Sequence, residues 1–171
     1  LGNFTAKNTP WYEYANDIKA IVIAKGVTEI GNYAFAYCKN AETVEIADTV
    51  TKIAPYAFYG AGLKEVTIPD SVKELGNGAF TYCRSLAKVE IPAGIKKVQN
   101  YTFFGCNKLE TALYAGDWNN LTINTGNDPL VNANKEEDTT PKAQVNTLGN
   151  LTVPVAGENY TLDTAYAFVA T

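Results

Sequence analysis

The most regular feature of this chain is a set of apolar residues that returns about every 23 positions. Four phenylalanines mark it, separated by 23, 22 and 23 residues: Phe35, Phe58, Phe80 and Phe103. The residues around them recur in step, roughly as V-x-x-I-x-x-x-A-F-x-x-C-x-x-L-x-x-V-x-I. One such unit is too small to bury its own apolar face, so the pattern predicts a solenoid of stacked units.

Each unit closes with alternating apolar and polar residues, which is typical of a half-buried strand. The apolar pairs are Val44 and Ile46, Val66 and Ile68, and Val89 and Ile91. Turn-forming residues follow directly, among them Asp48, Asp70 and Gly94, so we expect the chain to reverse there. The Ala-Phe segment in mid-unit is too short for a full helix and predicts a helical or 3₁₀ turn that places the phenylalanine in the core.

One copy of the unit carries a family resemblance. Residues 79–92 read AFTYCRSLAKVEIP, which is close to the repeat AF-x-x-C-x-x-L-x-x-I-x-I-P of the BspA-like leucine-rich repeats of bacterial surface proteins. The chain resembles this family from about residue 9 to residue 133. The resemblance implies a right-handed leucine-rich-repeat solenoid, rich in β structure, with about five short parallel strands and short helical or 3₁₀ turns.

The resemblance also divides the chain. It implies an N-terminal cap and first strand in residues 1–22, four BspA-like repeats in 23–114 and a C-terminal cap in 115–133. The apolar cap residues are Trp11, Ile18, Ile21 and Ile23 at the start, and Trp118, Leu121, Ile123 and Leu130 at the end. The second unit is one residue shorter, with Ala61 in the cysteine position, and the fourth has Ala112 and Tyr114 in place of strand aliphatics. We expect weaker packing at both places.

The remainder of the chain has no repeat. Residues 134–147 are polar and aperiodic, which indicates a linker. Residues 148–171 predict two strands, too few for an independent domain. They form either a short β appendage that packs back on the solenoid or the start of a second domain.

Composition excludes several classes of function. The chain has no histidine, so neither a Ser-His-Asp or Cys-His catalytic apparatus nor a histidine-ligated metal site is expected. With 14 basic and 18 acidic residues it has no basic stripe for nucleic acid, and it lacks the apolar run that a membrane-inserted helix needs. We expect no cofactor. Because the chain begins at Leu1 and contains no methionine, we expect a processed or excised piece.

The three cysteines, Cys38, Cys83 and Cys106, occupy one position of the repeat, beside the core phenylalanine. Their spacings match no zinc motif, and their position tolerates Ala61 in the second unit. We expect buried free thiols. A disulfide between Cys83 and Cys106 in adjacent units is the alternative, followed by a reactive or metal-binding role.

The strand residues that alternate with the buried ones form an exposed face. Its candidate ligand contacts are Thr43, Glu45, Glu65, Thr67, Lys88 and Glu90. At a strand spacing of about 4.8 Å, Glu45 and Glu90 would lie about 10 Å apart, which invites comparison with the paired carboxyls of glycoside hydrolases. The main interpretation is an ordinary solvated sheet face. A ligand-contact face is the second interpretation and a catalytic site is the last.

Three tyrosines, Tyr33, Tyr56 and Tyr101, stand two residues before the phenylalanine of their units. Tyrosine joins a flat apolar ring to a polar tip, which suits contacts with proteins and sugars. The simpler interpretation is that the rings cover the edges of a thin core. We retain these residues as candidates beside the strand face.

The family resemblance implies surface display and adhesion. We therefore expect a non-catalytic, extracellular binding module of a bacterial surface or secreted protein, which contacts a host protein or a glycan through the solenoid surface. A structural spacer that carries another domain is the first alternative, and a glycoside hydrolase is the second. The sequence specifies neither the ligand nor the oligomeric state.

Overall fold

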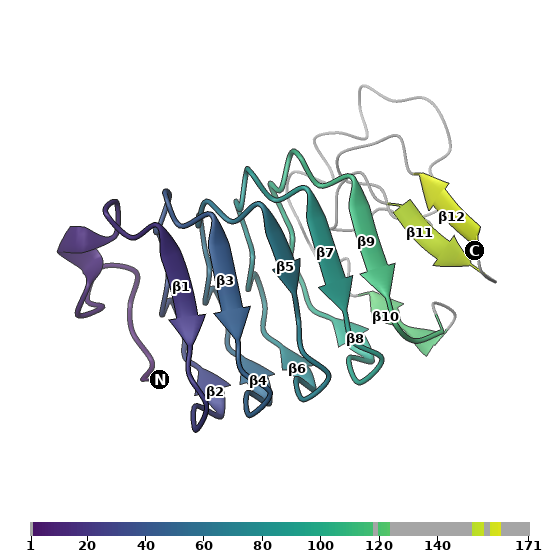
Figure 1. The fold of residues 1–171 in the computed structure, drawn as a ribbon, viewed down its shortest axis with the longest axis horizontal. Coiled ribbons are helices and arrows are strands. Elements are labelled where there is room, and N and C mark those ends of the chain that lie inside the picture. Colours follow the sequence, from purple (N-terminus) through teal and green to yellow (C-terminus); the bar gives the residue numbers. More distant parts are fainter. Residues whose placement is uncertain (1, 118–119, 124–151, 156–157, 162–171) are drawn as a thin grey trace.

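The computed structural model is a solenoid of short parallel strands, and it describes residues 2–117, 120–123, 152–155 and 158–161 (Figure 1). Each coil contributes one longer strand to the same side of the molecule. These are β1 (Ala20–Ile23), β3 (Thr43–Ile46), β5 (Glu65–Thr67), β7 (Lys88–Ile91) and β9 (Thr111–Tyr114). They coincide with the predicted alternating segments, so the solenoid and its parallel strands are confirmed.

A second row of strands, which the sequence analysis did not predict, runs along another side of the coils (Figure 1). It comprises β2 (Glu29–Ile30), β4 (Lys52–Ile53), β6 (Glu74–Leu75), β8 (Lys97–Val98) and β10 (Thr122–Ile123). Of the two residues in each of β2, β4, β6 and β8, the second is the buried apolar one. Two residues are too few to show an alternation of apolar and polar residues, so the sequence pattern does not predict these strands.

The sheet of longer strands is divided. β1 pairs with β3, and β7 pairs with β5 on one side and with β9 on the other, with partners such as Val66 and Val89 in register. Between β3 and β5 the ladder is interrupted, although the Lys64 amide still donates to the Glu42 carbonyl at 3.0 Å. The interruption follows the short second unit, in which Phe58 and β5 are one residue closer than Phe35 and β3.

The Ala-Phe segments are successions of tight turns rather than the expected helical or 3₁₀ turns. Within a coil the Ala36 amide donates to the Tyr33 carbonyl at 3.0 Å, and between coils the Phe35 amide donates to the Ala57 carbonyl at 2.7 Å. A helix would direct all these amides along its own axis. The left-handed backbone at Tyr33 and Tyr37 instead interrupts the helical course and lets alternate amides reach the next coil. Among the described residues, helical structure is limited to the 3₁₀ turn η1 (Tyr12–Tyr14) and to Asn120, which is in 3₁₀ conformation.

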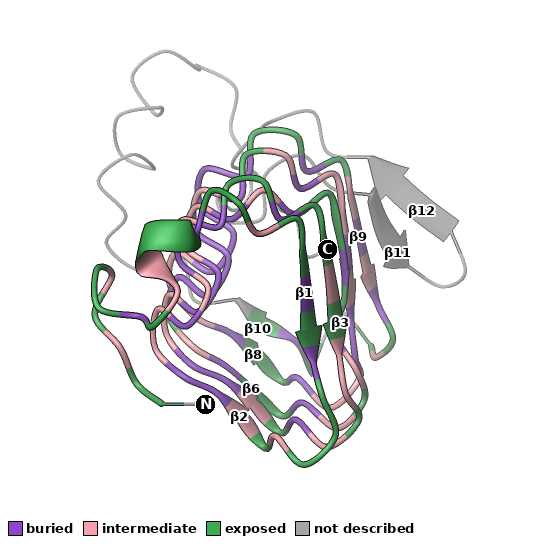
Figure 2. Ribbon diagram, turned by 60° about the vertical axis from the view of Figure 1, so that its left-hand side comes forward, coloured by how far each residue is buried: buried purple, intermediate pink, exposed green. Residues whose placement is uncertain are grey.

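The core contains a continuous stack of aromatic rings. Trp11, Phe35, Phe58, Phe80 and Phe103 follow one another with ring centroids 5.2 to 5.6 Å apart and nearly parallel planes. The last three are fully buried, and Trp11 stands at the N-terminal end of the stack, where its indole Nε1 also donates to the Ala34 carbonyl at 2.7 Å. Seen from the side of η1, the coils lie one behind another around this buried interior (Figure 2).

The three cysteines are free and buried, as expected. The Cys83 thiol donates to the Phe58 carbonyl at 3.1 Å and the Cys106 thiol to the Phe80 carbonyl at 3.2 Å. Burial raises the pKa of Cys38 to about 11 and that of Cys83 to about 12, and it raises the pKa of Cys106 well above its usual value. All three thiols therefore stay protonated at neutral pH, which does not favour a nucleophilic role.

The C-terminal part of the chain is described only in pieces. Leu121 is buried beside β10, which pairs with β8, as a capping residue would be. Strands β11 (Thr152–Val155) and β12 (Glu158–Thr161) form an antiparallel hairpin, and β11 lies beside β9 (Figure 1). Trp118, Leu130 and the linker 134–147 lie outside the described residues, and the division of the chain into domains stays a prediction.

Candidate functional site

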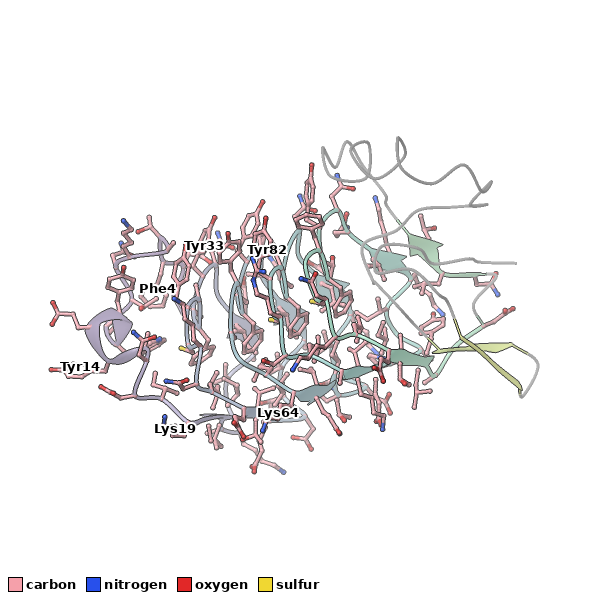
Figure 3. The ribbon with its side chains drawn as sticks, turned by 90° about the horizontal axis from the view of Figure 1, so that it is seen from above. Phe4, Tyr14, Lys19, Tyr33, Lys64 and Tyr82 are labelled. Carbon is pink, nitrogen blue, oxygen red and sulfur yellow. The ribbon has the colours of Figure 1, made fainter. Side chains whose placement is uncertain are left out.

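Aromatic side chains line one flank of the solenoid, on the outer side of the Ala-Phe turns. This tyrosine flank consists of Tyr33, Tyr37, Tyr56, Tyr59, Tyr82, Tyr101 and Phe104. All of its tyrosines are partly exposed. Tyr33 and Tyr82 project from the same long side of the molecule, away from Lys19 and Lys64 (Figure 3).

The rings of the flank touch in sequence from coil to coil. Tyr33 stacks on Tyr56 with ring centroids 5.0 Å apart, and Tyr56 meets the edge of Tyr59 at 6.1 Å. Tyr59 then packs edge to face against Tyr82 at 5.5 Å, and Tyr82 packs against Phe104 at 5.4 Å. Each contact between rings contributes about 0.5 to 1.5 kcal/mol beyond area burial, so neighbouring rings hold one another in place.

Five of these tyrosines have a left-handed backbone, with φ between 54° and 64°: Tyr33, Tyr37, Tyr56, Tyr82 and Tyr101. They occupy two positions of the repeat, two residues before and two residues after the phenylalanine. Glycine takes the same positions in other coils, as Gly78 in the first and Gly60 and Gly105 in the second. A left-handed conformation costs a bulky residue about 1 to 2 kcal/mol, so tyrosine is there in spite of the backbone.

Two phenols of the flank, those of Tyr33 and Tyr59, are partly buried neutral groups. Partial burial, with smaller contributions from neighbouring tyrosines, raises the pKa of Tyr33 and of Tyr59. At neutral pH both rings therefore keep their hydroxyl protons and both donate and accept hydrogen bonds. The flank offers flat apolar rings with polar tips, which is the chemistry of a binding surface.

The strand face carries the other predicted candidates. Thr43 and Glu45 project from β3, Glu65 and Thr67 from β5, and all four are exposed, whereas Lys88 and Glu90 on β7 are half-buried. The structure pairs Glu65 with Lys88 and Thr67 with Glu90 in neighbouring strands. Because β3 and β5 are unpaired, Glu45 stands outside this ladder.

Glu90 is tied to its neighbours. Its carboxylate accepts a hydrogen bond from the Lys88 ammonium at 2.6 Å and another from the Thr67 hydroxyl at 3.3 Å. The hydrogen bond from Lys88 lowers the pKa of Glu90, so the carboxylate stays ionised at neutral pH. A general acid needs a raised pKa instead, so this environment does not favour the glycoside hydrolase hypothesis.

A third surface accompanies the row of short strands. Lys52 lies between Glu29 and Glu74, with ion-pair distances of 3.5 and 3.9 Å. A shallow groove of about 570 Å³ lies beside them and includes Lys96 and Lys97 in its walls. The ion pairs are exposed, so each contributes little to stability.

Three tyrosines of the flank, Tyr37, Tyr59 and Tyr82, and also Phe104 were not among the candidates from the sequence. A usable signal existed for two of them, since Tyr37 and Tyr82 share a repeat position with Gly60 and Gly105. Tyr59 has no such signal, because its position holds Ala36, Thr81 and Phe104 in the other coils. Only the stacking of coils shows that it joins the same surface.

The comparisons with known proteins identify the family. The model described as a BspA type leucine rich repeat region matches residues 8–125 in six copies. The chain belongs to the BspA-type leucine-rich-repeat family. The match extends beyond the four expected repeats into both segments assigned to caps. No curated protein matches this BspA-type chain.

Several solved structures resemble the BspA-type chain. A leucine-rich repeat protein from Eubacterium ventriosum is 24% identical with a TM-score of 0.52, over 67% of this chain and 37% of that one. A leucine-rich repeat protein from Bacteroides ovatus is 27% identical, with a TM-score of 0.46 and coverage of 68% and 39%. A leucine rich cell surface protein from Faecalibacterium prausnitzii is 23% identical, with a TM-score of 0.45 and coverage of 56% and 35%. The chain thus spans well under half of these structures, and the first of them supports the fold.

Two kinds of feature are absent from the part of the chain that the structure describes. No helix in that part of the chain is long and apolar enough to cross a membrane. No group of three or more acidic or cysteine side chains is placed there to hold a metal ion.

Proposed function

We propose that this chain is a non-catalytic binding module of a bacterial surface or secreted protein, and that it contacts an extracellular protein or glycan through the tyrosine flank. One observation carries the proposal. Tyrosine occupies left-handed backbone positions that glycine fills in other coils of the same solenoid.

The fold does not require a ring at these positions. Gly78 stands where Tyr33, Tyr56 and Tyr101 stand, and Gly60 stands where Tyr37 and Tyr82 stand, so the coil closes without a ring at either position. Strained conformations of this kind cluster at functional sites. A partner that uses the rings would explain why the strained residues are tyrosines.

The flank is also rigid. Amides of successive turns donate to the next coil, as Tyr37 to the Tyr59 carbonyl at 2.7 Å and Tyr82 to the Phe104 carbonyl at 2.6 Å. Rings mounted on such a ladder lose little further freedom when a partner binds, so more of the contact energy remains as affinity.

The strand face is the other candidate surface, and the spacer is the other candidate function. Glu65 and Thr67 are exposed on a flat sheet, as both a solvated face and a protein contact would be. The spacer hypothesis needs no ligand at all. A single set of variants separates the three.

The test measures binding of the whole chain to immobilised extracellular-matrix proteins and to a glycan array by surface plasmon resonance. We expect saturable binding to at least one target. The double variant Tyr33→Gly/Tyr56→Gly should weaken it at least about tenfold, because aromatic anchors dominate interface energies and glycine suits their backbone. Glu65→Lys on the strand face is the matched control and should bind like the parent chain.

Two results would revise the proposal. Loss of binding in Glu65→Lys, with the tyrosine variant unaffected, would transfer the contact to the strand face. If no target bound saturably, the spacer would replace the binding module.

A further inference from the structure

The second coil has an irregular loop where the repeat is one residue short. In the regular coils two residues separate the cysteine position from the next buried apolar residue, as Arg84 and Ser85 do between Cys83 and Leu86. In the second coil Gly62 alone separates Ala61 from Leu63. The second coil is therefore one residue shorter here. It has glycine, without a side chain, where the first coil has Lys39 and the third has Arg84.

Gly62 lies directly against the first coil. Its amide donates to the Cys38 carbonyl at 3.0 Å, and a Cβ built on it would come within 1.9 Å of the Lys39 carbonyl oxygen. A larger residue is therefore excluded here without movement of the backbone. The close approach leaves a groove of about 410 Å³ across the second coil, between the loops of the first and third.

Three tyrosines of the flank line this groove. Tyr37 comes from the first coil and Tyr82 from the third, while Gly60 takes their repeat position in the second coil and contributes no ring. Tyr59 stands edge-on to both, with ring centroids 5.4 Å from Tyr37 and 5.5 Å from Tyr82. The volume falls within the range of about 300 to 1,000 Å³ that is usual for small-ligand sites.

The groove is basic although the chain is acidic. Lys39 and Arg84 line it together with the Ser85 hydroxyl group, and no carboxylate does so, while the whole chain has a net charge of −4. The Arg84 guanidinium lies 5.2 Å from the centre of the Tyr82 ring, which keeps it at the rim. Within the described part of the chain, neither Lys39 nor Arg84 forms a salt bridge.

These features select a class of ligand. Tyrosine rings pack against the C–H faces of a sugar ring, hydroxyl groups of Tyr59 and Ser85 suit its hydroxyls, and two cations that form no salt bridge within the described residues suit a carboxylate. We propose that the groove over Gly60 to Gly62 binds a carboxylated saccharide, with Tyr37, Tyr59 and Tyr82 against the sugar and Lys39 and Arg84 on its carboxylate. This assignment rests on the proposed function and narrows it to one ligand class and one site.

The probe is trigalacturonic acid, and galactotriose serves as its uncharged counterpart. Isothermal titration calorimetry of the full chain should show saturable binding of the acidic trisaccharide, at least about tenfold weaker binding of the neutral one, and weakening with added salt. The variant Lys39→Gln/Arg84→Gln should lose at least about tenfold in affinity for the acidic probe. The control variant Lys96→Gln/Lys97→Gln makes the same change of charge in the shallow groove beside the short strands, and it should bind the acidic probe like the parent chain.

A second variant removes a ring and leaves the cations. Tyr59→Ser should weaken the binding of both trisaccharides by a similar factor, because it acts on the sugar ring and not on the carboxylate. Circular dichroism and the melting temperature of each variant show that the solenoid remains folded, so a loss of affinity is assigned to the groove.

Each contrary result overturns the assignment. If Lys39→Gln/Arg84→Gln and Lys96→Gln/Lys97→Gln lost the same affinity for trigalacturonic acid, the binding would be general electrostatic attraction. If a polyglutamate peptide bound more tightly than trigalacturonic acid, the ligand would be an acidic peptide. If trigalacturonic acid failed to bind while the chain still bound another target, the ligand class would be wrong and the proposed function would stand. If neither the trisaccharides nor any other target bound saturably, the proposed binding function and the saccharide assignment would both be wrong.

Discussion

Inside the solenoid each coil adds an aromatic ring to a single stack, whereas on the tyrosine flank some coils carry tyrosine and others glycine at the same repeat position. Phe58, Phe80 and Phe103 are fully buried with parallel neighbours, and none of these positions is left small. On the flank Gly60 separates Tyr37 from Tyr82. Both regions repeat with the same period, so the difference arises from what each position must do.

The two regions differ because packing between coils demands a ring at the interior positions and does not demand one on the flank. An interior position that lost its ring would leave a cavity between two coils, so every coil needs one there. A flank position faces solvent and requires only a left-handed residue, which glycine supplies. Packing of the coils therefore does not account for the tyrosines of the flank, and the proposed function does.

The largest expected effect is in the interior. Phe58→Ala and Phe80→Ala should each lower the free energy of unfolding by about 3 to 5 kcal/mol, because each opens a cavity in the aromatic stack. Urea denaturation followed by circular dichroism measures it. A loss below about 1 kcal/mol would mean that the stack is not the core of the solenoid.

The buried thiols give a smaller, pH-dependent effect. Their pKa is higher in the folded chain than in the unfolded chain, so their contribution to stability is complete below about pH 9 and is lost as pH rises towards 11 to 12. The loss at pH 10 is about 1 kcal/mol for each thiol.

Replacing all three cysteines by alanine, which Ala61 already represents in the second coil, removes this dependence. Urea midpoints of both chains at pH 8 and pH 10 are the measurement. All other titratable groups are common to the two chains, so parallel pH curves would contradict the buried, protonated state of the thiols.

The smallest effect is expected on the flank. Tyr56→Gly should cost no more than about 1 kcal/mol, because loss of the contacts with Tyr33 and Tyr59 is offset by relief of the left-handed backbone. Tyr56→Ala keeps the Cβ and should be no more stable than Tyr56→Gly. Thermal melting compares the two, and a clear advantage for alanine would show that the backbone there is not strained.

Much of the fold was predictable from the sequence. The spacing of Phe35, Phe58, Phe80 and Phe103 predicted stacked coils, and the alternation around Val66 and Val89 predicted the longer strands. Both patterns are local, and both are imposed by burial on one side of the chain. Two-residue strands such as β4 and β6 carry no such pattern, because pairing between coils alone defines them.

The candidate site was predicted less completely. Tyr33, Tyr56 and Tyr101 were candidates from their shared position, but the groove was not, since the missing residue beside Gly62 was interpreted as weaker packing. In the structure the loops of the first and third coils face each other across the groove over the shortened second coil. The missing residue therefore produces a groove only because longer loops lie on both sides of it.

The sequence by itself determined the period, the buried positions and the family, because each depends on the type of residue at a fixed spacing along one coil. The tertiary structure decided the second row of strands, the interruption between β3 and β5, the left-handed tyrosines and the groove over Gly60 to Gly62. These features depend on distances between coils. Such distances are set by hydrogen bonds and side-chain contacts across about 5 Å of space, between residues more than twenty positions apart in the chain.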